Sequence, residues 1–178
     1  MTKFSRGAAL AILAGALAWT SPAPAAVSDA WITAKTKISL MTNEGLGNAS
    51  AINVDTNEGV VTLHGKVATA DAKQKAEDVA KGIEGVKSVK DLLQVVPKPQ
   101  RDAVDKGDDI VKDDVKKAFD ADPAVKDSGI SVASVNKGVV LLSGSAKSLD
   151  AHLRAVKLAR KVPGVHRVSS EVTVEGTN

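Results

Sequence analysis

The chain contains the same folding unit twice. The seven residues Gly59-Val60-Val61-Thr62-Leu63-His64-Gly65 return as Gly138-Val139-Val140-Leu141-Leu142-Ser143-Gly144, 79 residues later. The same spacing relates Gly85-Val86 to Gly164-Val165, and it relates three evenly spaced alanines to three others: Ala72, Ala76 and Ala80 to Ala151, Ala155 and Ala159. The duplication therefore predicts two copies of one fold before any single residue is interpreted.

Each copy shows the pattern of two helices and three strands. In the first copy, apolar residues at intervals of four predict a helix over residues 31–41, with Asp29 placed to cap its start. Alternating residues then predict a hairpin of strands over 51–56 and 60–67, joined by a turn at Asn57-Glu58-Gly59. A second helix follows over about 69–83, and a last strand runs through Val89, Leu93 and Val95.

The second copy repeats this order, so the predicted fold is α+β. We expect two tandem α-β-β-α-β modules, each a small three-stranded sheet with two helices packed on one face. The modules span residues 29–96 and 108–175. Residues 97–107 contain Pro97 and Pro99 and lack apolar periodicity at their start, which predicts a linker. Gly65 and Gly144 lie where a strand gives way to the second helix, and we interpret them as sites of close backbone packing or positive φ.

The N-terminal residues have the pattern of a secretory signal peptide. Lys3 and Arg6 precede an apolar run over residues 8–19, and small residues lead to Ala25. The pattern predicts a signal peptide over residues 1–25, cleaved after Ala25 or Ala26. The run is about half as long as the ~20 residues needed to cross a bilayer, so we expect no transmembrane segment in the mature chain. The sequence has no cysteine, which excludes disulfides and a lipid-modified N-terminal cysteine.

Charge and composition argue against nucleic-acid binding. The formal net charge of +3 falls to about +1 when the predicted signal peptide is removed. Aromatic residues make up 2% of the chain and there is no tyrosine. Nucleic-acid binding normally needs a concentrated basic face and, for single strands, aromatic side chains for stacking.

The titratable residues form no pattern that predicts catalysis. The three histidines fall on different predicted elements without zinc-type spacing: His64, His152 and His166. An acidic cluster lacks the spacing of a calcium loop, and we expect it to cap and charge the first turns of a helix: Asp108, Asp109, Asp113 and Asp114. The sequence therefore predicts no catalytic, cofactor or metal site and a protein that is not an enzyme.

The second helix of the second copy differs from its counterpart on one face. Leu149, Leu153 and Val156 form an apolar strip where the first copy has Ala70, Gln74 and Glu77. Four cations run beside it, interrupted by Asp150: Lys147, Arg154, Lys157 and Lys161. Such a surface suits an anionic lipid interface. Alternatively, the strip packs against the first module and the cations are solvated, or it receives unfolded segments of client proteins.

The repeated pattern resembles the BON domain (bacterial OsmY and nodulation domain). The similarity rests on Gly-Val-Val-x-Leu-x-Gly, the spaced alanines and Gly-Val-x-x-Val, and it covers residues 29–96 and 108–174. It implies a periplasmic protein of envelope stress or maintenance, like the osmotically inducible proteins. The implied partners are an anionic phospholipid surface or envelope proteins. A periplasmic chaperone-like role in binding client polypeptides is the alternative.

Overall fold

The computed structural model describes residues 27–47 and 49–175. The predicted signal peptide therefore lies outside the described residues. The first module contains α1 (Asp29–Met41), the short 3₁₀ turns η1 (Glu44–Leu46) and η2 (Ala49–Ala51), β1 (Ile52–Asn57), β2 (Val60–Val67), α2 (Ala70–Lys81), β3 (Ser88–Asp91) and β4 (Gln94–Val95). The second contains α3 (Arg101–Asp120), α4 (Pro123–Lys126), β5 (Gly129–Asn136), β6 (Val139–Ala146), α5 (Leu149–Lys161), β7 (Arg167–Ser170) and β8 (Thr173–Val174).

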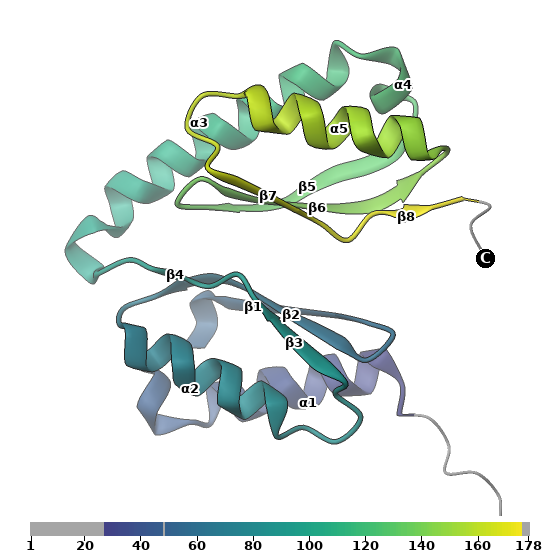
Figure 1. Ribbon diagram of the computed structural model, residues 1–178. Helices are drawn as coiled ribbons and strands as arrows, with labels where there is room; N and C mark the ends of the chain where they lie inside the picture. The colour runs from purple at the N-terminus through teal and green to yellow at the C-terminus, as the bar shows by residue number, and fades with distance from the viewer. Residues whose placement is uncertain (1–26, 48, 176–178) are drawn as a thin grey trace, which may run out of the picture.

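Both modules have the same topology, as the duplication predicts. The second strand of the hairpin is central in each sheet: β2 pairs antiparallel with β1 and parallel with β3 and β4, and β6 pairs in the same way with β5, β7 and β8. Two helices cover one face of each sheet, and Figure 1 shows them on the outer sides of the molecule. The predicted α+β fold of two tandem modules is confirmed.

The single last strand predicted for each module is divided into two short strands. The reason is a local hydrogen bond: the amide of Leu93 donates to Asp91 Oδ1 at 2.8 Å, and the amide of Val172 donates to Ser170 Oγ at 3.3 Å. A side chain that accepts from the backbone two residues later turns the chain away from the ladder. Both pieces still pair with the same central strand.

Asp29 does not cap α1, contrary to the prediction from sequence. Ser28 is the N-cap residue, and its side chain accepts from the amide of Trp31 at 3.3 Å. The Asp29 carboxylate instead accepts from the amides of Glu58 and Gly59, at 2.7 and 2.8 Å, in the β1–β2 turn. This turn has positive φ at both residues, and the two hydrogen bonds tie the first helix to the hairpin.

The interpretation of the acidic cluster is also corrected by the structure. Residues 97–107, the predicted linker, contain the 3₁₀ turn η3 (Lys98–Gln100) and the first turns of α3. Asp108 therefore lies inside a helix and not in its first turn. It is buried, and its carboxylate accepts from the amides of Lys137 and Gly138 at 2.9 and 3.1 Å. It thus repeats the contact that Asp29 makes in the first module.

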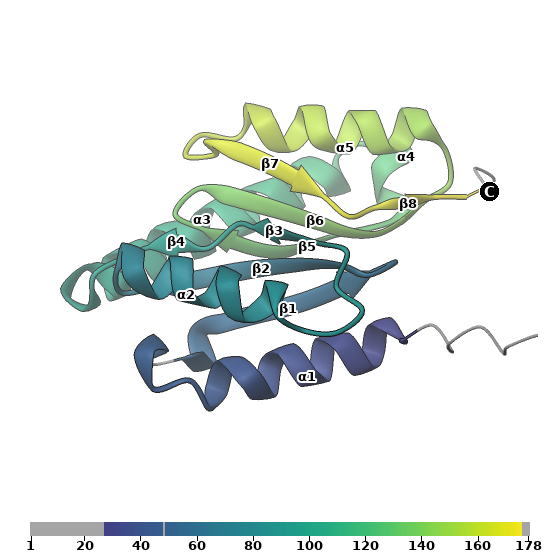
Figure 2. The same ribbon diagram turned by 60° about the horizontal axis from the view of Figure 1, so that its bottom comes forward.

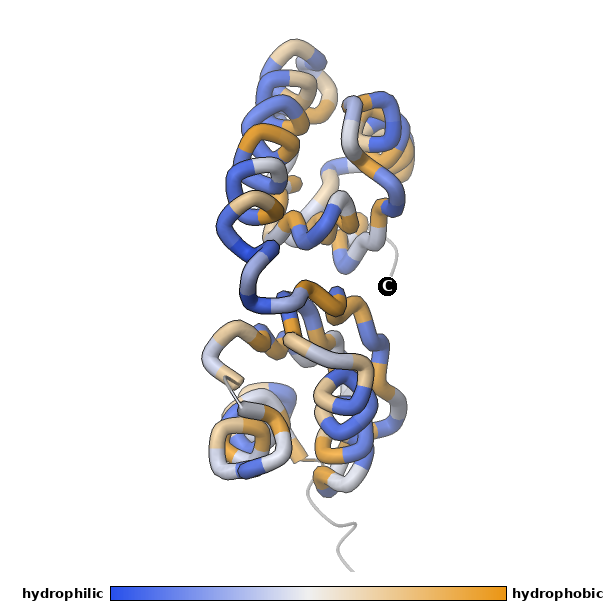
Figure 3. Tube along the Cα trace, turned by 90° about the vertical axis from the view of Figure 1, so that its left-hand side faces the viewer, coloured by the Kyte–Doolittle hydropathy of each residue, from blue (hydrophilic) through white to orange (hydrophobic). Residues whose placement is uncertain are grey.

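The two sheets pack against each other through the faces that carry no helices. Figures 2 and 3 show the resulting four layers, with a pair of helices on each outer side and both sheets in the middle. β2 lies against β5. Three of the largest fully buried side chains belong to neither module's own core, and strand alternation directs them to the other sheet: Leu92, Val96 and Leu141.

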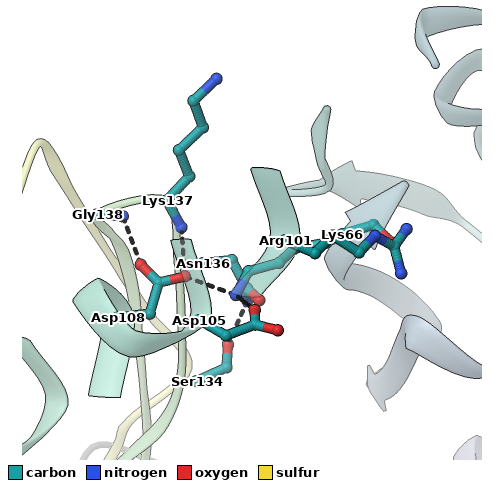
Figure 4. A network of polar contacts seen from close by, with 8 residues as sticks. All are labelled: Lys66, Arg101, Asp105, Asp108, Ser134, Asn136, Lys137 and Gly138. Atoms are coloured by element: carbon teal, nitrogen blue, oxygen red, sulfur yellow. Dashed lines mark hydrogen bonds and ion pairs between the residues drawn. The ribbon is translucent and has the colours of Figure 1, made fainter. Parts of the chain in front are cut away.

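An ion cluster fixes the register of the two modules (Figure 4). Lys66 of β2 forms ion pairs with Asp105 and with Asp108, the latter at 2.6 Å, and Arg101 Nη2 donates to the carbonyl of Lys66 at 3.2 Å. Burial by itself would lower the pKa of Lys66, but the hydrogen bonds to Asp105 and Asp108 outweigh it, and the pKa is raised. A raised pKa means that this contact stabilises the fold below the ordinary lysine pKa and is lost as pH rises through the folded value.

The prediction for Gly65 and Gly144 is confirmed, since both have positive φ, 125° and 102°. A Cβ at Gly144 would collide with the carbonyl oxygen of Gly129.

We expect Gly144→Ala to lower the free energy of unfolding by about 1–3 kcal/mol or more. Gly107 lies within α3 with open space around it, so Gly107→Ala should raise the free energy by about 0.5–1 kcal/mol. Urea unfolding of both variants checks this pair.

The buried contact between the sheets should couple the unfolding of the two modules. Leu92→Ala removes a side chain that is fully buried outside either core. We expect a loss of about 2–5 kcal/mol, as for other buried leucines, and a broader or two-step unfolding curve. Calorimetry checks both. A variant that still unfolds in one transition at the wild-type temperature would show that the sheets do not support each other.

Candidate functional site

The candidate site lies on the outer face of α5, and its position follows from three alanines. Ser148 caps the helix by accepting from the amide of Ala151 at 3.2 Å. Ala151, Ala155 and Ala159 are buried. Their small side chains allow the helix to lie close to the sheet, and the residues on the opposite side of the helix therefore face solvent.

Two of the three residues of the predicted apolar strip are solvent-exposed. Leu149 and Leu153 each retain 59% of their accessible surface. Val156 is half-buried and packs against the core of its own module. The first module covers the other face of the sheet (Figure 1). The interpretation that the strip packs against the first module is therefore wrong, because that contact is made by the two sheets.

The four predicted cations differ in their surroundings. Arg154 is held by two carboxylates: its Nε lies 2.6 Å from Asp150 Oδ2, and its Nη1 lies 3.7 Å from Asp122 Oδ2. The hydrogen bond to Asp150 raises the pKa of the Arg154 guanidinium. In the described part of the chain, no carboxylate lies within ion-pair distance of the other three: Lys147, Lys157 and Lys161. The positive charges of these three lysines on the outer face of α5 are therefore not neutralised by an ion pair.

A shallow groove of about 440 Å³ runs along this face of α5. The residues that line it are Leu153, Arg154, Lys157, Leu158 and Lys161, with the carboxylates of Asp122 and Asp150. The structure thus brings four of the seven predicted residues to one groove. Leu149 and Lys147 lie one turn or more towards the start of the helix.

Arg160 also belongs to this surface, although it was not among the residues predicted from the sequence. This residue is exposed in the last turn of α5. It follows Leu153 by seven residues, which is close to two helical turns, so it lies on the same face as Leu149 and Leu153. The seven-residue spacing from Leu153 is the sequence signal by which it could have been found. Arg160 places a cation at the far end of the apolar strip.

Two of the three histidines make side-chain hydrogen bonds that join elements of the fold. His152 Nε2 lies 2.8 Å from Ser170 Oγ, joining α5 to β7. The equivalent positions in the first module hold Lys73 and Asp91, whose Nζ and Oδ2 atoms are 3.6 Å apart. Because the same positions are bridged by different chemistry in the two copies, the shared role is to brace the helix against the sheet.

His64 is buried between the sheets, where its Nε2 lies 2.8 Å from Asp55 Oδ2. This hydrogen bond lowers the pKa of Asp55. The third histidine, His166, is exposed. Each histidine thus lies in a different environment, as their sequence positions indicate.

Among the helices of residues 27–47 and 49–175, none combines the length and the apolar composition that a bilayer-spanning segment needs. Within the same ranges, no three histidine or carboxylate side chains are grouped as metal ligands would be.

Comparison with known proteins identifies both modules. The family model described as "BON domain" matches residues 28–97 and again residues 107–176. The chain is 35% identical over 152 residues to Osmotically-inducible protein Y of Escherichia coli, an alignment that covers 82% of this chain and 72% of that protein. It is 36% identical over 125 residues to the Outer membrane lipoprotein DolP of Haemophilus influenzae, covering 70% of this chain and 61% of the relative.

Among solved structures, the chain is similar to the C-terminal domain of CdsD, a structural protein of the type III secretion system of Chlamydia trachomatis. The match covers 84% of this chain and 67% of that one, with 18% sequence identity and a TM-score of 0.31.

The exposure of the strip leads to a prediction about stability. Replacing Leu149 and Leu153 together by alanine should change the free energy of unfolding by no more than about 0.5 kcal/mol, because both side chains are already in water. Val156→Ala should cost about 1 kcal/mol or more, since Val156 contacts the core. Urea unfolding compares the variants. A large loss for the leucine pair would mean that the strip is covered.

Proposed function

The chain belongs to the BON-domain family, with two copies of the domain in tandem, and on this basis we propose that it is a non-enzymatic periplasmic protein of envelope stress or maintenance. We further propose that its second BON domain binds anionic phospholipid through the outer face of α5. Three features support the periplasmic assignment: the signal-peptide pattern of residues 1–25, the osmotic induction named in one relative and the outer membrane named in the other.

The observation that carries the lipid proposal is the combination of exposed leucines with unpaired lysines. Leu149 and Leu153 lie on the outermost side of α5, and Lys157 and Lys161 lie beside them without a carboxylate partner in the described residues. An interfacial helix uses apolar side chains to enter the boundary between headgroups and acyl chains, and cations to contact the headgroups. Each lysine or arginine near an anionic surface contributes about 1 kcal/mol.

The first module lacks this surface, although it has the same fold. At the positions of Leu153, Val156 and Lys157 the α2 helix carries Gln74, Glu77 and Asp78. The fold therefore does not require large apolar groups or cations on this helix face. Their presence on α5 is best explained by a contact outside the chain.

Sedimentation with lipid vesicles tests the proposal. We expect the protein to bind vesicles of phosphatidylglycerol and phosphatidylcholine at low salt, and binding should weaken as salt is added because the attraction is screened. Lys157→Glu with Lys161→Glu should weaken binding by about tenfold or more, since two cationic contacts of about 1 kcal/mol each are lost.

A matched control is available on the neighbouring helix. Lys106 and Lys116 of α3 are exposed and have no carboxylate partner in the described residues. Replacing both by glutamate gives the same change in net charge, and it should reduce binding much less. Equal loss in both double variants would indicate attraction by net charge alone. No binding to anionic vesicles, together with suppression of a client protein's aggregation, would favour the chaperone-like alternative.

A further inference from the structure

The first module also presents an exposed apolar strip, on α1. Trp31, Ile38 and Met41 retain 43%, 59% and 69% of their accessible surface. Their spacing of seven and three residues places them along one line of the helix. The core side of α1 is formed by Ile32, Thr36 and Leu40, all buried, and this line is on the opposite side. The strip therefore points directly away from the protein.

The charges beside this strip are positive. Lys35 and Lys37 are exposed on either side of it, and in the described residues neither lies within ion-pair distance of a carboxylate, although the charge of Lys37 helps to lower the pKa of Asp55. Asp29, the acidic residue of the first turn, is bound to the β1–β2 turn by two hydrogen bonds. The apolar line is thus flanked by cations, as on α5. A tryptophan in such a position is typical of a membrane interface, where its ring has one apolar and one wet end.

The equivalent helix of the second module provides a contrast. Ile110 of α3 occupies the position of Trp31 and is 64% exposed. Asp109, Asp113 and Asp114 lie near it on the same helix, together with Lys106 and with Lys117, which pairs with Asp114. The three carboxylates make this site less favourable for an anionic surface than the α1 strip is. Of the two equivalent helices, α1 therefore has the more basic strip, which is complementary to an anionic lipid surface.

A second copy of the chain fits the α1 strip less well. A symmetric contact places the same patch of both copies together. The lysines flanking one strip would then lie against those of the other, and like charges in such a contact are unfavourable. We therefore assign an anionic lipid surface as the partner of α1.

The fold places the two strips on opposite sides of the molecule. Because the sheets pack against each other, α1 and α5 lie in the two outer layers and face away from one another (Figure 2). One flat membrane cannot contact both. We propose that the protein bridges two anionic membrane surfaces, one bound by α5 and the other by α1. This inference rests on the proposed function of α5 and adds a second surface and a bridging activity.

Clustering of vesicles tests bridging separately from binding. With vesicles of equal parts phosphatidylglycerol and phosphatidylcholine, we expect the wild-type protein to raise turbidity at low salt. Trp31→Ala with Ile38→Ala should still sediment with vesicles through α5, while turbidity falls to that of vesicles alone. Leu149→Ala with Leu153→Ala should likewise abolish clustering. Ile110→Ala, the matched control on α3, should cluster vesicles as the wild type does.

Fluorescence of Trp31 reports the contact directly. The chain has two tryptophans, and Trp19 lies in the predicted signal peptide, so the exported protein carries Trp31 alone. In the variant with Leu149 and Leu153 replaced by alanine, vesicle binding should depend on α1, and the Trp31 emission should shift to shorter wavelength. Lys35→Glu with Lys37→Glu keeps the apolar strip and should also abolish clustering, which provides a second test if the Trp31 variant does not fold.

Several results would overturn the bridging proposal. One is a wild-type protein that binds vesicles without clustering them, which leaves the proposed function intact. Another is clustering by the Trp31 and Ile38 double variant at the wild-type level. A third is a dimer in the absence of lipid that this variant abolishes, because α1 would then bind a second copy. Absence of any vesicle binding by the wild type would instead refute the proposed function.

Discussion

The arrangement of this protein depends on the contact between its two open sheet faces. Each module covers one face of its sheet with helices and leaves the other to be covered by its neighbour. Leu92 and Val96 of the first module and Leu141 of the second are fully buried there although they belong to neither core. Small modules bury little surface by themselves. The contact adds to the buried surface of both and turns the helices of the two modules outward in opposite directions.

A carboxylate that has the same local role in both modules also links the two modules to each other. Asp29 and Asp108 hold the hairpin turn in their respective copies. In the second copy the same carboxylate also pairs with Lys66 of the first module. The residue equivalent to Lys66 in the second copy is Ser145, so the duplication has diverged at this point. A local anchor in one module thus became part of the interface between the two.

The outer helices have diverged as well, and this divergence carries the functional argument. α5 and α1 have apolar residues flanked by lysines on their outermost sides, whereas the exposed Ile110 of α3 has three aspartates as well as lysines near it. The alanines that hold α5 against its sheet are shared with α2. The shared residues therefore build the fold, and the residues that differ between the copies provide the external surfaces.

The order of helices and strands, the hairpin turns and the role of Gly65 and Gly144 were determined by the sequence alone, because periodicity and turn chemistry act between neighbours in the chain. The tertiary structure decided what Asp29 and Asp108 bind and which face of α5 remains exposed, since these depend on residues about 30 positions away or in the other module. The sequence of the first copy does contain one pattern that indicates the interface between the sheets. In the first copy, Leu92-Leu93 and Val95-Val96 place apolar residues on both faces of the last predicted strand. In the second copy, Glu171 and Glu175 occupy the positions of Leu92 and Val96, so one face of that strand is charged. That pattern indicates a sheet buried on both sides, but only the packed structure identifies what covers the second side.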